Sequence, residues 1–366
     1  MYIHQRENWT DFRWDTEKVS AALVKVRYRQ GRLLGKMEGL GFQIGDETQL
    51  STLALDVVRS NEIEGENLNM EQVRSSIARR LGLEIQETRF HAPAVSRHVD
   101  SVVEMMLDAT QNYALPLTRK RLFGWHAGLF PTGFNGIYKI SVGKYRKGHI
   151  EVISGSLGKP KVHFEGPEAS RLDNEMARFL DWFNGAAQID PVLKAAIAHF
   201  WFVTIHPFED GNGRIARALA DMQLARGEGS PRRFYSMSSR ILAERKRYYQ
   251  VLETTQHGDG DITEWLEWFL VCLERAIEES EITLAGVLSR ARFWEAHAQT
   301  LLNARQQKMI NLLLGHFEGK LTSSKWAKIA GCSQDTALRD IRDLIGKGIL
   351  RQEEGGGRST GYGLQI

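Results

Sequence analysis

The sequence is poor in cysteine, and its two cysteines, Cys272 and Cys332, lie far apart. Neither has the spacing of a metal-ligand pair, which argues against a disulfide framework and against a thiolate metal site. No apolar run is long enough to cross a membrane, and the polar start, Met1 to Asn8, lacks the pattern of a signal peptide. We therefore expect a cytoplasmic protein without a membrane partner.

An excess of charge of one sign is also lacking. The chain has 48 Lys and Arg against 45 Asp and Glu, a formal net charge of +3, which argues against a surface that binds nucleic acid everywhere. Its 366 residues, 42% of them hydrophobic and 25% charged, are ordinary for a globular chain of about two or three domains. No repeat and no low-complexity tract is present.

The most informative segment follows a long apolar stretch. Asp190 and Pro191 form a good helix opening, and the residues from Val192 to Ile205 are almost entirely apolar, which predicts a buried helix. His206 ends this helix, and Pro207 stops it.

The next residues complete the string HPFEDGNGRIAR, residues 206–217, which we call the signature segment. Its glycines predict a tight turn before a second helix from about Arg214 to Arg226, stopped by Gly227. Arg214 and Arg217 share a face of the first turn, next to the positive end of the helix dipole. This arrangement predicts a bound anion.

The signature segment resembles that of the Fic-domain family, H-x-F-x-(D/E)-G-N-G-R-x-x-R, at every fixed position. The resemblance extends over about residues 50–275. It implies a mainly α fold, with a helical core and a β-hairpin flap, and the transfer of AMP from ATP to a hydroxyl side chain of a target protein. A lone histidine at a helix end is more often structural, and a lone arginine pair is more often solvated, but their joint arrangement favours a phosphate site.

The resemblance also assigns roles. His206 would be the general base for the target Ser, Thr or Tyr hydroxyl, and Asp210 would hold Mg²⁺. Arg214 would neutralise the departing pyrophosphate, and Arg217 would reach the γ-phosphate. The turn residues would form the anion hole; they are Gly211, Asn212 and Gly213.

Further residues have weaker signals. Phe208 is expected to anchor the loop in the core, and Glu209 to face solvent. Tyr248 and Tyr249 correspond to a tyrosine pair that lies near adenine in related proteins, and Gln256 follows on the same predicted helix. Aromatic residues at helical spacing are also typical of a core, so both interpretations remain open for these three.

A second motif indicates control of the site. Residues 60–65, SNEIEG, resemble the inhibitory motif (S/T)-x-x-x-E-(G/N) of many Fic proteins, at Ser60 and Glu64. A carboxylate in the last turn of a helix ended by Gly65 needs a cation, which in the family is the second signature arginine, here Arg217. The resemblance implies that this pair makes ATP bind unproductively. The alternative is an ordinary surface glutamate.

Residues 150–164 contain two short β-type runs around a glycine-rich turn, which predicts a hairpin. The family has such a flap, which holds the target segment by strand addition. The candidate docking residues are Ile153, Ser154, Gly155 and His163. A plain edge hairpin is the alternative.

The expected organisation is an N-terminal helical cap over 1–45, a Fic core over 46–285 with the inhibitory helix at 47–65, a linker helix at 286–305 and a winged-helix domain at 306–366. The last assignment depends on a helix, turn, helix and glycine-rich hairpin pattern. Its candidate DNA contacts are Thr336, Arg339, Arg342 and Arg358. Acidic residues on the same helix oppose DNA binding, so a protein-docking or dimerising module is the alternative, and a homodimer is a further expectation.

Two other functions compete with AMP transfer. The same residues would serve the removal of AMP from a modified protein, with Glu64 positioning the water. A DNA-binding regulator whose Fic core only senses a nucleotide is the third hypothesis.

Overall fold

The computed structural model describes residues 1–39, 42–83, 94–154, 161–186, 188–314, 317, 319–353 and 360–365. The chain divides into two compact units, Met1–Ser280 and Glu281–Ile366. Most regular structure in the described residues is helical, and the sheets are two-stranded hairpins, so the expected mainly α class is confirmed. None of the described helices has the length and apolar character needed to cross a membrane.

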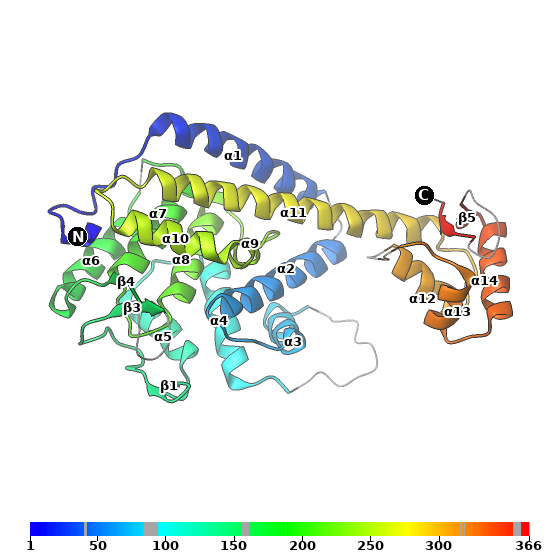
Figure 1. Ribbon diagram of the computed structural model, residues 1–366, viewed down its shortest axis with the longest axis horizontal. Coiled ribbons are helices and arrows are strands. Elements are labelled where there is room, and N and C mark those ends of the chain that lie inside the picture. The colour runs from blue at the N-terminus through cyan, green and yellow to red at the C-terminus, as the bar shows by residue number, and fades with distance from the viewer. Residues whose placement is uncertain are drawn as a thin grey trace. The chain divides into compact units, whose positions relative to one another are not determined.

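The first unit is a helical body with two small hairpins (Figure 1). Its elements in chain order are η1 (Ile3–Gln5), α1 (Thr16–Glu38), α2 (Phe42–Ile63), α3 (Met70–Leu81), α4 (Arg97–Gln111), α5 (Arg119–Leu129), β1 (Phe134–Asn135), β2 (Tyr138–Lys139), β3 (Glu151–Ser154), β4 (Lys161–Glu165), η2 (Ala169–Arg171), α6 (Leu172–Asn184), α7 (Pro191–Ile205), α8 (Asn212–Glu228), α9 (Met237–Ala243), α10 (Arg245–Gln256) and α11 (Thr263–Ala296), which continues into the second unit.

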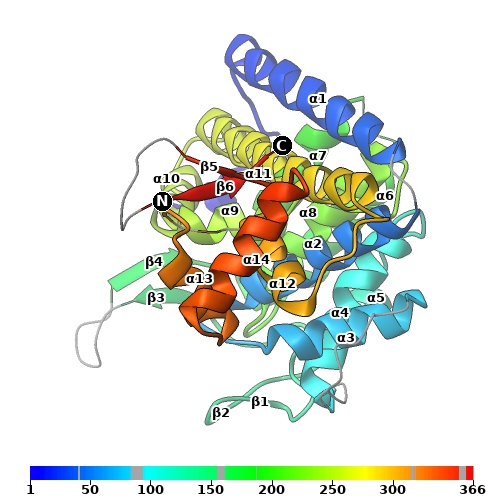
Figure 2. The ribbon, with the colours of Figure 1, turned by 90° about the vertical axis from the view of Figure 1, so that its right-hand side faces the viewer.

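The predicted helix at residues 16–38 is α1, capped by the Asp15 side chain. It lies along the first-unit part of α11, where Arg29 donates to Glu274 at 3.0 Å (Figures 1 and 2). Just before α1, Trp9 packs edge-on against Trp201 of α7, with ring centroids 6.2 Å apart. The aromatic residues at the N-terminus therefore attach this segment to the central helix.

Helix α7 is the centre of the first unit, since every residue from Val192 to Ile205 is buried. The Asp190 side chain accepts the Val192 N–H at 2.8 Å, and Pro191 occupies the first helical position, as predicted. Helix α7 packs along α8, and the loop between them carries the first part of the signature segment.

The predicted limits of α8 are wrong at both ends. The helix begins at Asn212 and ends at Glu228, so Gly227 lies inside it. A Cβ on Gly227 would lie 2.5 Å from Cβ of Pro191, so this glycine permits the close approach of α7. The stop is Gly229, whose φ of 62° is left-handed.

Helix α2 overlaps the predicted inhibitory helix at 47–65 and begins earlier, at Phe42. Buried Asp56 fixes it to the start of α9, because it accepts hydrogen bonds from the Ser236 hydroxyl at 2.5 Å and the Ser238 N–H at 3.1 Å. The chain leaves α2 at Ile63 and turns at Gly65, whose φ is 84°.

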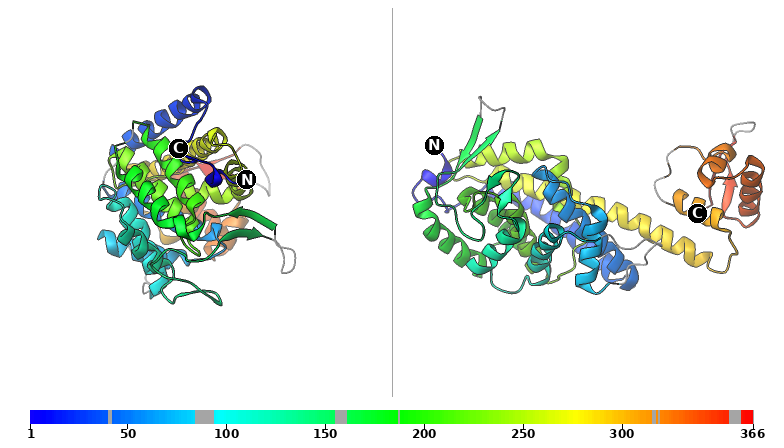
Figure 3. Two further views of the ribbon diagram at one scale, coloured as in Figure 1. Left: turned by 90° about the vertical axis from the view of Figure 1, so that its left-hand side faces the viewer. Right: turned by 90° about the horizontal axis from the view of Figure 1, so that it is seen from below.

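The hairpin of β3 and β4 projects from the first unit (Figure 3). Its strands are antiparallel, with Val152 opposite Phe164 and Ile153 opposite Val162. His163 is therefore the extra residue of a β-bulge. Gly155, one of the candidate docking residues, lies outside the described residues.

The second unit contains the end of α11 and its own small core. Its other elements are α12 (Ala304–Leu313), α13 (Ser323–Ala330), α14 (Gln334–Gly346), β5 (Leu350–Gln352) and β6 (Tyr362–Leu364). Fully buried Trp326 and Ile341 belong to its core. Within the predicted linker helix at 286–305, residues up to Ala296 belong to α11, and α12 starts at Ala304.

On α14, Arg339 and Arg342 are exposed, and Thr336 is half-buried. Asp340 is buried and bound by Arg305 at 2.8 Å, so part of the acidic charge on this helix is neutralised within the unit. Arg358 lies outside the described residues.

Candidate active site

His206 follows the last residue of α7 in a left-handed conformation, with φ 50° and ψ 57°. This conformation is strained for a non-glycine residue and turns the chain sharply into the signature loop. The ring Nδ1 lies 3.1 Å from the Val203 carbonyl oxygen. Because that contact needs a proton on Nδ1, the neutral ring leaves Nε2 as a proton acceptor.

Burial lowers the pKa of His206 to about 4, and the positive charge of Arg146 acts in the same direction. The imidazole is therefore uncharged at neutral pH. An uncharged ring with Nε2 unprotonated is the form that a general base requires.

This pKa leads to a prediction about pH. We expect an NMR titration of His206, assigned with His206→Asn, to show an uncharged ring down to about pH 5. The usual pKa is 6.5, so between 6.5 and about 4 the unfolded chain takes up a proton that the folded chain does not. His206 should therefore lower the free energy of unfolding as pH falls through that window, and urea unfolding should show a smaller loss in His206→Asn. A titration midpoint near 6.5 would contradict the lowered pKa.

The loop after His206 is anchored by a buried aromatic side chain and by hydrogen bonds within the loop. Phe208 is fully buried and stacks on His126, with ring centroids 4.2 Å apart. The Asn212 side chain closes the loop, since it accepts the Phe208 N–H at 3.0 Å and donates to the Phe208 carbonyl at 2.9 Å. The anchoring position of Phe208 agrees with the prediction. The predicted solvent exposure of Glu209 is wrong, because its carboxylate accepts the Ser141 N–H at 2.8 Å and it is half-buried.

The start of α8 forms a cradle suited to an anion. Gly211 is the N-cap, with φ 79°, and no side chain caps the helix. A Cβ on Gly211 would lie 3.0 Å from the Phe130 ring, so both the backbone conformation and the space require glycine. The amides of an uncapped first turn and the helix dipole favour negative charge at this point.

A carboxylate lies in this cradle. Arg217 donates to Glu64 Oε1 at 2.8 Å, to Ser60 Oγ at 2.8 Å and to the Ser60 carbonyl at 2.8 Å. The Arg217 side chain is only 2% exposed, and its Nη1 has no hydrogen-bond partner in the part of the chain that the structure describes. A Cβ on Gly213 would lie 2.4 Å from Glu64 Oε1, so this carboxylate sits against the first turn of α8.

A second carboxylate, that of Glu66, binds Arg214. Arg214 Nη1 donates to Glu66 Oε2 at 2.7 Å, and the Arg214 guanidinium lies over the Phe130 ring, 5.1 Å from the centroid. Glu66 Oε1 lies 2.6 Å from His98 Nε2, at the start of α4. The sequence interpretation missed Glu66 and His98, because the family motif ends at Gly65.

Asp210 is the only signature carboxylate placed for a metal. One of its oxygens accepts the Gly211 N–H at 2.5 Å, and the other accepts from the side chain of Asn135 on β1. The described residues contain no group of three potential metal ligands. A single, partly exposed carboxylate fits Mg²⁺, which is held mainly by phosphate oxygens and water in nucleotide sites.

The part of the chain that carries this geometry is similar to known proteins. The family model "Fic/DOC family" matches residues 116–224, which include the whole signature segment. The chain contains a Fic/DOC domain. A second model, described as a domain of unknown function (DUF4172), matches residues 2–83, which include Ser60, Glu64 and Glu66.

Curated relatives are named protein adenylyltransferase Fic. The protein from Drosophila willistoni is 33% identical over 137 residues, 36% of this chain and 26% of that protein. The one from Drosophila virilis is 25% identical over 228 residues, 61% of this chain and 41% of that protein. The chain thus spans less than half the length of these relatives.

Two solved structures share the fold. The Fic family protein from Desulfovibrio desulfuricans has a TM-score of 0.54 at 20% identity and covers 96% of both chains. Fic-1 (aa134–508) from C. elegans has a TM-score of 0.51 at 21% identity and covers 74% of both chains.

Helix α10 carries the three predicted nucleotide-binding residues, and only one of them has an exposed side chain. Tyr248 is 1% exposed, and its hydroxyl bonds His199 Nε2 at 2.9 Å. Gln256 is 5% exposed and donates to Thr204 at 3.2 Å. Tyr249 is 37% exposed, so among these three it is the ring available to a base.

The β3–β4 hairpin, which is the predicted flap, is fastened to the same helix. His163 Nε2 lies 2.6 Å from Ser154 Oγ, and its Nδ1 lies 2.7 Å from a carboxylate oxygen of Glu253. Lys161 pairs with Glu253 at 3.3 Å. Ile153 is 57% exposed, which leaves an apolar side chain of β3 open to a partner.

Arg146 supports the loop between α7 and α8 from outside the signature segment. Its guanidinium donates to three carbonyls: His206 at 2.8 Å, Gly148 at 2.8 Å and Pro167 at 2.5 Å. It is 3% exposed, and burial lowers its pKa to about 10, which leaves it charged at neutral pH. Arg146 thus ties the His206 backbone to the chain on both sides of the β3–β4 hairpin.

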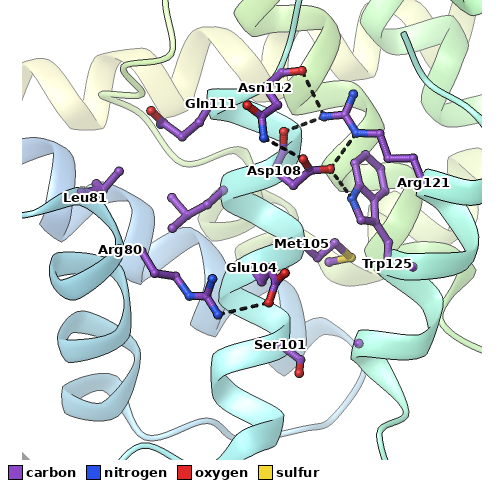
Figure 4. Close-up of a pocket in the computed structure, with 13 residues that line it drawn as sticks. Arg80, Leu81, Ser101, Glu104, Met105, Asp108, Gln111, Asn112, Arg121 and Trp125 are labelled. Atoms are coloured by element: carbon purple, nitrogen blue, oxygen red, sulfur yellow. Dashed lines mark hydrogen bonds and ion pairs between the residues drawn. The ribbon is translucent and has the colours of Figure 1, made fainter. Parts of the chain in front are cut away.

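A separate cavity of about 560 Å³ lies between α3, α4 and α5 (Figure 4). Arg80 pairs with Glu104 at 3.1 Å, and Asp108 accepts from Arg121 at 2.6 Å and from Trp125 at 2.7 Å. These lining groups satisfy one another, and none of the lining residues belongs to the signature segment. The cavity is therefore not the candidate active site.

Proposed function

We propose that this chain is a protein adenylyltransferase, which transfers AMP from ATP to a hydroxyl side chain of a target protein. The observation that carries the proposal is the placement of His206, with Nδ1 at the Val203 carbonyl and Nε2 left as the acceptor, beside an uncapped helix start that two buried arginines flank. The names of the curated relatives support the same reaction.

The residues divide the reaction between them. His206 Nε2 takes the proton of the target hydroxyl as its oxygen attacks the α-phosphorus of ATP. The bond from the α-phosphorus to the bridging oxygen breaks, and pyrophosphate leaves with the negative charge, which Arg214 and Arg217 balance. Mg²⁺, held by Asp210, would neutralise phosphate charge. The exposed β3 and β4 strands would hold the target segment by backbone hydrogen bonds.

Glu64 would restrain this activity in the resting chain. Its carboxylate binds the guanidinium of Arg217 and lies against the first turn of α8, where phosphate oxygens would bind. ATP must displace it to place the γ-phosphate on Arg217. The pair is largely buried on the arginine side, so its loss is expected to matter more than that of a surface ion pair.

Glu64→Gly is expected to raise AMP transfer by at least about tenfold, the effect of about 1.4 kcal/mol. The test is intact-mass spectrometry of the chain and of candidate targets after incubation with Mg²⁺ and ATP. Glu62→Gly is a matched control, because Glu62 lies on the same segment and pairs with Arg59, outside the signature segment. If neither the wild type nor Glu64→Gly places AMP on itself or on any of several targets, the proposed transfer is wrong.

Removal of AMP from a modified protein is the second candidate. It is favoured by the carboxylate partners of both arginines, which leave the resting cradle better suited to a monophosphate than to a triphosphate. In this case Glu64→Gly should slow the release of AMP from an adenylylated peptide. Faster transfer with no release would exclude this candidate.

The second unit is proposed to dock a macromolecule. Exposed Arg339 and Arg342 on α14 are the residues that would contact DNA phosphates in a winged-helix arrangement. DNA binding is tested by a salt-dependent gel shift, which should be lost when Arg339 and Arg342 are both changed to alanine. If the wild type gives no shift, a protein partner is favoured.

A further inference from the structure

Glu66 pairs with Arg214, the first arginine of the signature segment, as Glu64 pairs with Arg217, the second. Its Oε2 lies 2.7 Å from Nη1 of Arg214, whose side chain is only 6% exposed. Asp210 Oδ1 lies 3.9 Å from Nη2 of the same guanidinium. Two carboxylates thus surround the cation that would receive the pyrophosphate.

We propose that Glu66 is a specificity-determining residue of the nucleotide site, whose carboxylate takes the place of the second phosphate at Arg214 and so disfavours di- and triphosphates relative to a monophosphate. This inference rests on the proposed function for the phosphate that Arg214 receives. Glu64 would act on the third phosphate, through Arg217. The two carboxylates therefore oppose different parts of the same ligand.

One turn of the backbone places both carboxylates. The N–H groups of Glu64 and Glu66 both donate to the Asn61 carbonyl, each at 3.0 Å. Gly65 between them has φ 84°, which a residue with a side chain adopts only with strain. Because the turn is closed on Asn61, Glu64 and Glu66 reach adjacent arginines of one helix face.

His98 acts as a positioning residue for Glu66. Its Nε2 lies 2.6 Å from Oε1, so the two oxygens of Glu66 face different partners on α4 and α8. The His98 contact is the main cause that lowers the pKa of Glu66 below its usual value, and Arg214 contributes to the same shift. The carboxylate is therefore charged when it meets Arg214.

The charges explain why a phosphate must displace Glu66 to bind. With Glu66 and Asp210 in place, a further anion at Arg214 would face two negative charges and one positive charge. Like charges at such short separations repel strongly where water is partly excluded. Glu66 is 35% exposed, so it has solvent to move into, whereas the buried Arg214 has not. Nε of Arg214 is buried and has no hydrogen-bond partner among the described residues.

The test is a calorimetric titration of the full chain with AMP, ADP and ATP, in the absence of a divalent metal. Glu66→Gln removes the charge and keeps the shape. We expect it to tighten ADP binding by roughly tenfold, about 1.4 kcal/mol, and to leave AMP binding within about twofold. Glu64→Gln should instead tighten ATP relative to ADP. Glu62→Gln, the matched control, should change none of the three affinities.

His98→Gln gives a second measurement, because it should tighten ADP binding by less than Glu66→Gln does. If Glu66→Gln does not fold, Glu66→Asp keeps the charge on a side chain that is one methylene too short to reach His98 and Arg214 together, and ADP should again bind more tightly. The proposal is overturned if the folded variant binds ADP as the wild type does, or if AMP gains as much as ADP. AMP transfer is measured separately. If Glu66→Gln tightens ADP binding but Glu64→Gly transfers no AMP, the proposed adenylyltransferase activity is wrong and the role of Glu66 stands. If Glu64→Gly transfers AMP but Glu66→Gln does not tighten ADP binding, the role of Glu66 is wrong and the proposed activity stands.

Discussion

His206→Ala, made in the Glu64→Gly chain, is expected to reduce AMP transfer by roughly 10²–10⁴-fold, the usual contribution of a general base. The physical reason is the loss of the acceptor Nε2, which the Val203 contact leaves unprotonated. Nucleotide binding should change little, because the arginines and the start of α8 are untouched. Transfer is measured with labelled ATP, and binding by calorimetry with ADP.

The left-handed backbone of His206 complicates the alanine variant, since alanine tolerates this conformation poorly. Asparagine adopts it more readily and has no imidazole, so His206→Asn separates the lost base from backbone strain. His149→Ala, at an exposed histidine ahead of β3, is the matched control and should keep full activity. Transfer that survives in His206→Asn at more than about a tenth of the control would contradict the role of general base.

The parts of the site predicted from the sequence are those with local causes. The cap at Asp190, the buried run after Val192 and the turn at Gly211 are each encoded within a few residues, so their positions follow from helix rules. The contact of Glu64 with Arg217 spans 153 residues and was expected only through the family resemblance. No spacing in the chain indicates that pair by itself.

The incorrect predictions come from contacts made only in three dimensions. Gly227 was predicted as a helix stop because glycine is typical at that position. However, α7 lies so close that glycine is needed inside α8. Glu209 was expected to face solvent because it is a polar residue at a variable position of the family motif. Its carboxylate instead accepts the Ser141 N–H from the segment after β2. Neither partner is near in sequence, so local propensity could not include it.

Arg146, Asn135 and His98 were missed for the same reason. Each contacts the signature segment or its partner from a distant part of the chain: Arg146 through His206, Asn135 through Asp210, and His98 through Glu66. An arginine that binds carbonyls has no sequence pattern that separates it from an arginine on the surface. Only the fold reveals which of them supports the site.

Arg146→Ala is therefore the prediction that depends most on the structure. Three carbonyls, of His206, Gly148 and Pro167, would lose their donor, and each buried unpaired polar group costs about 1–3 kcal/mol. Because water reaches part of the gap, we expect the free energy of unfolding to fall by roughly 2–4 kcal/mol in urea titrations. Lys147→Ala, at the exposed neighbouring residue, should leave stability unchanged.

The same variant should lose transfer activity without losing ADP affinity, because Arg146 contacts the His206 backbone and does not contact α8. Loss of a positive charge beside the ring should also raise the pKa of His206, which shifts the acid limb of the activity profile to higher pH. Arg146→Lys keeps that charge but cannot donate in the planar fork of a guanidinium, so it should restore the pH profile more fully than the stability. A variant that is destabilised but transfers AMP at the control rate, with an unshifted acid limb, would assign Arg146 to the fold alone.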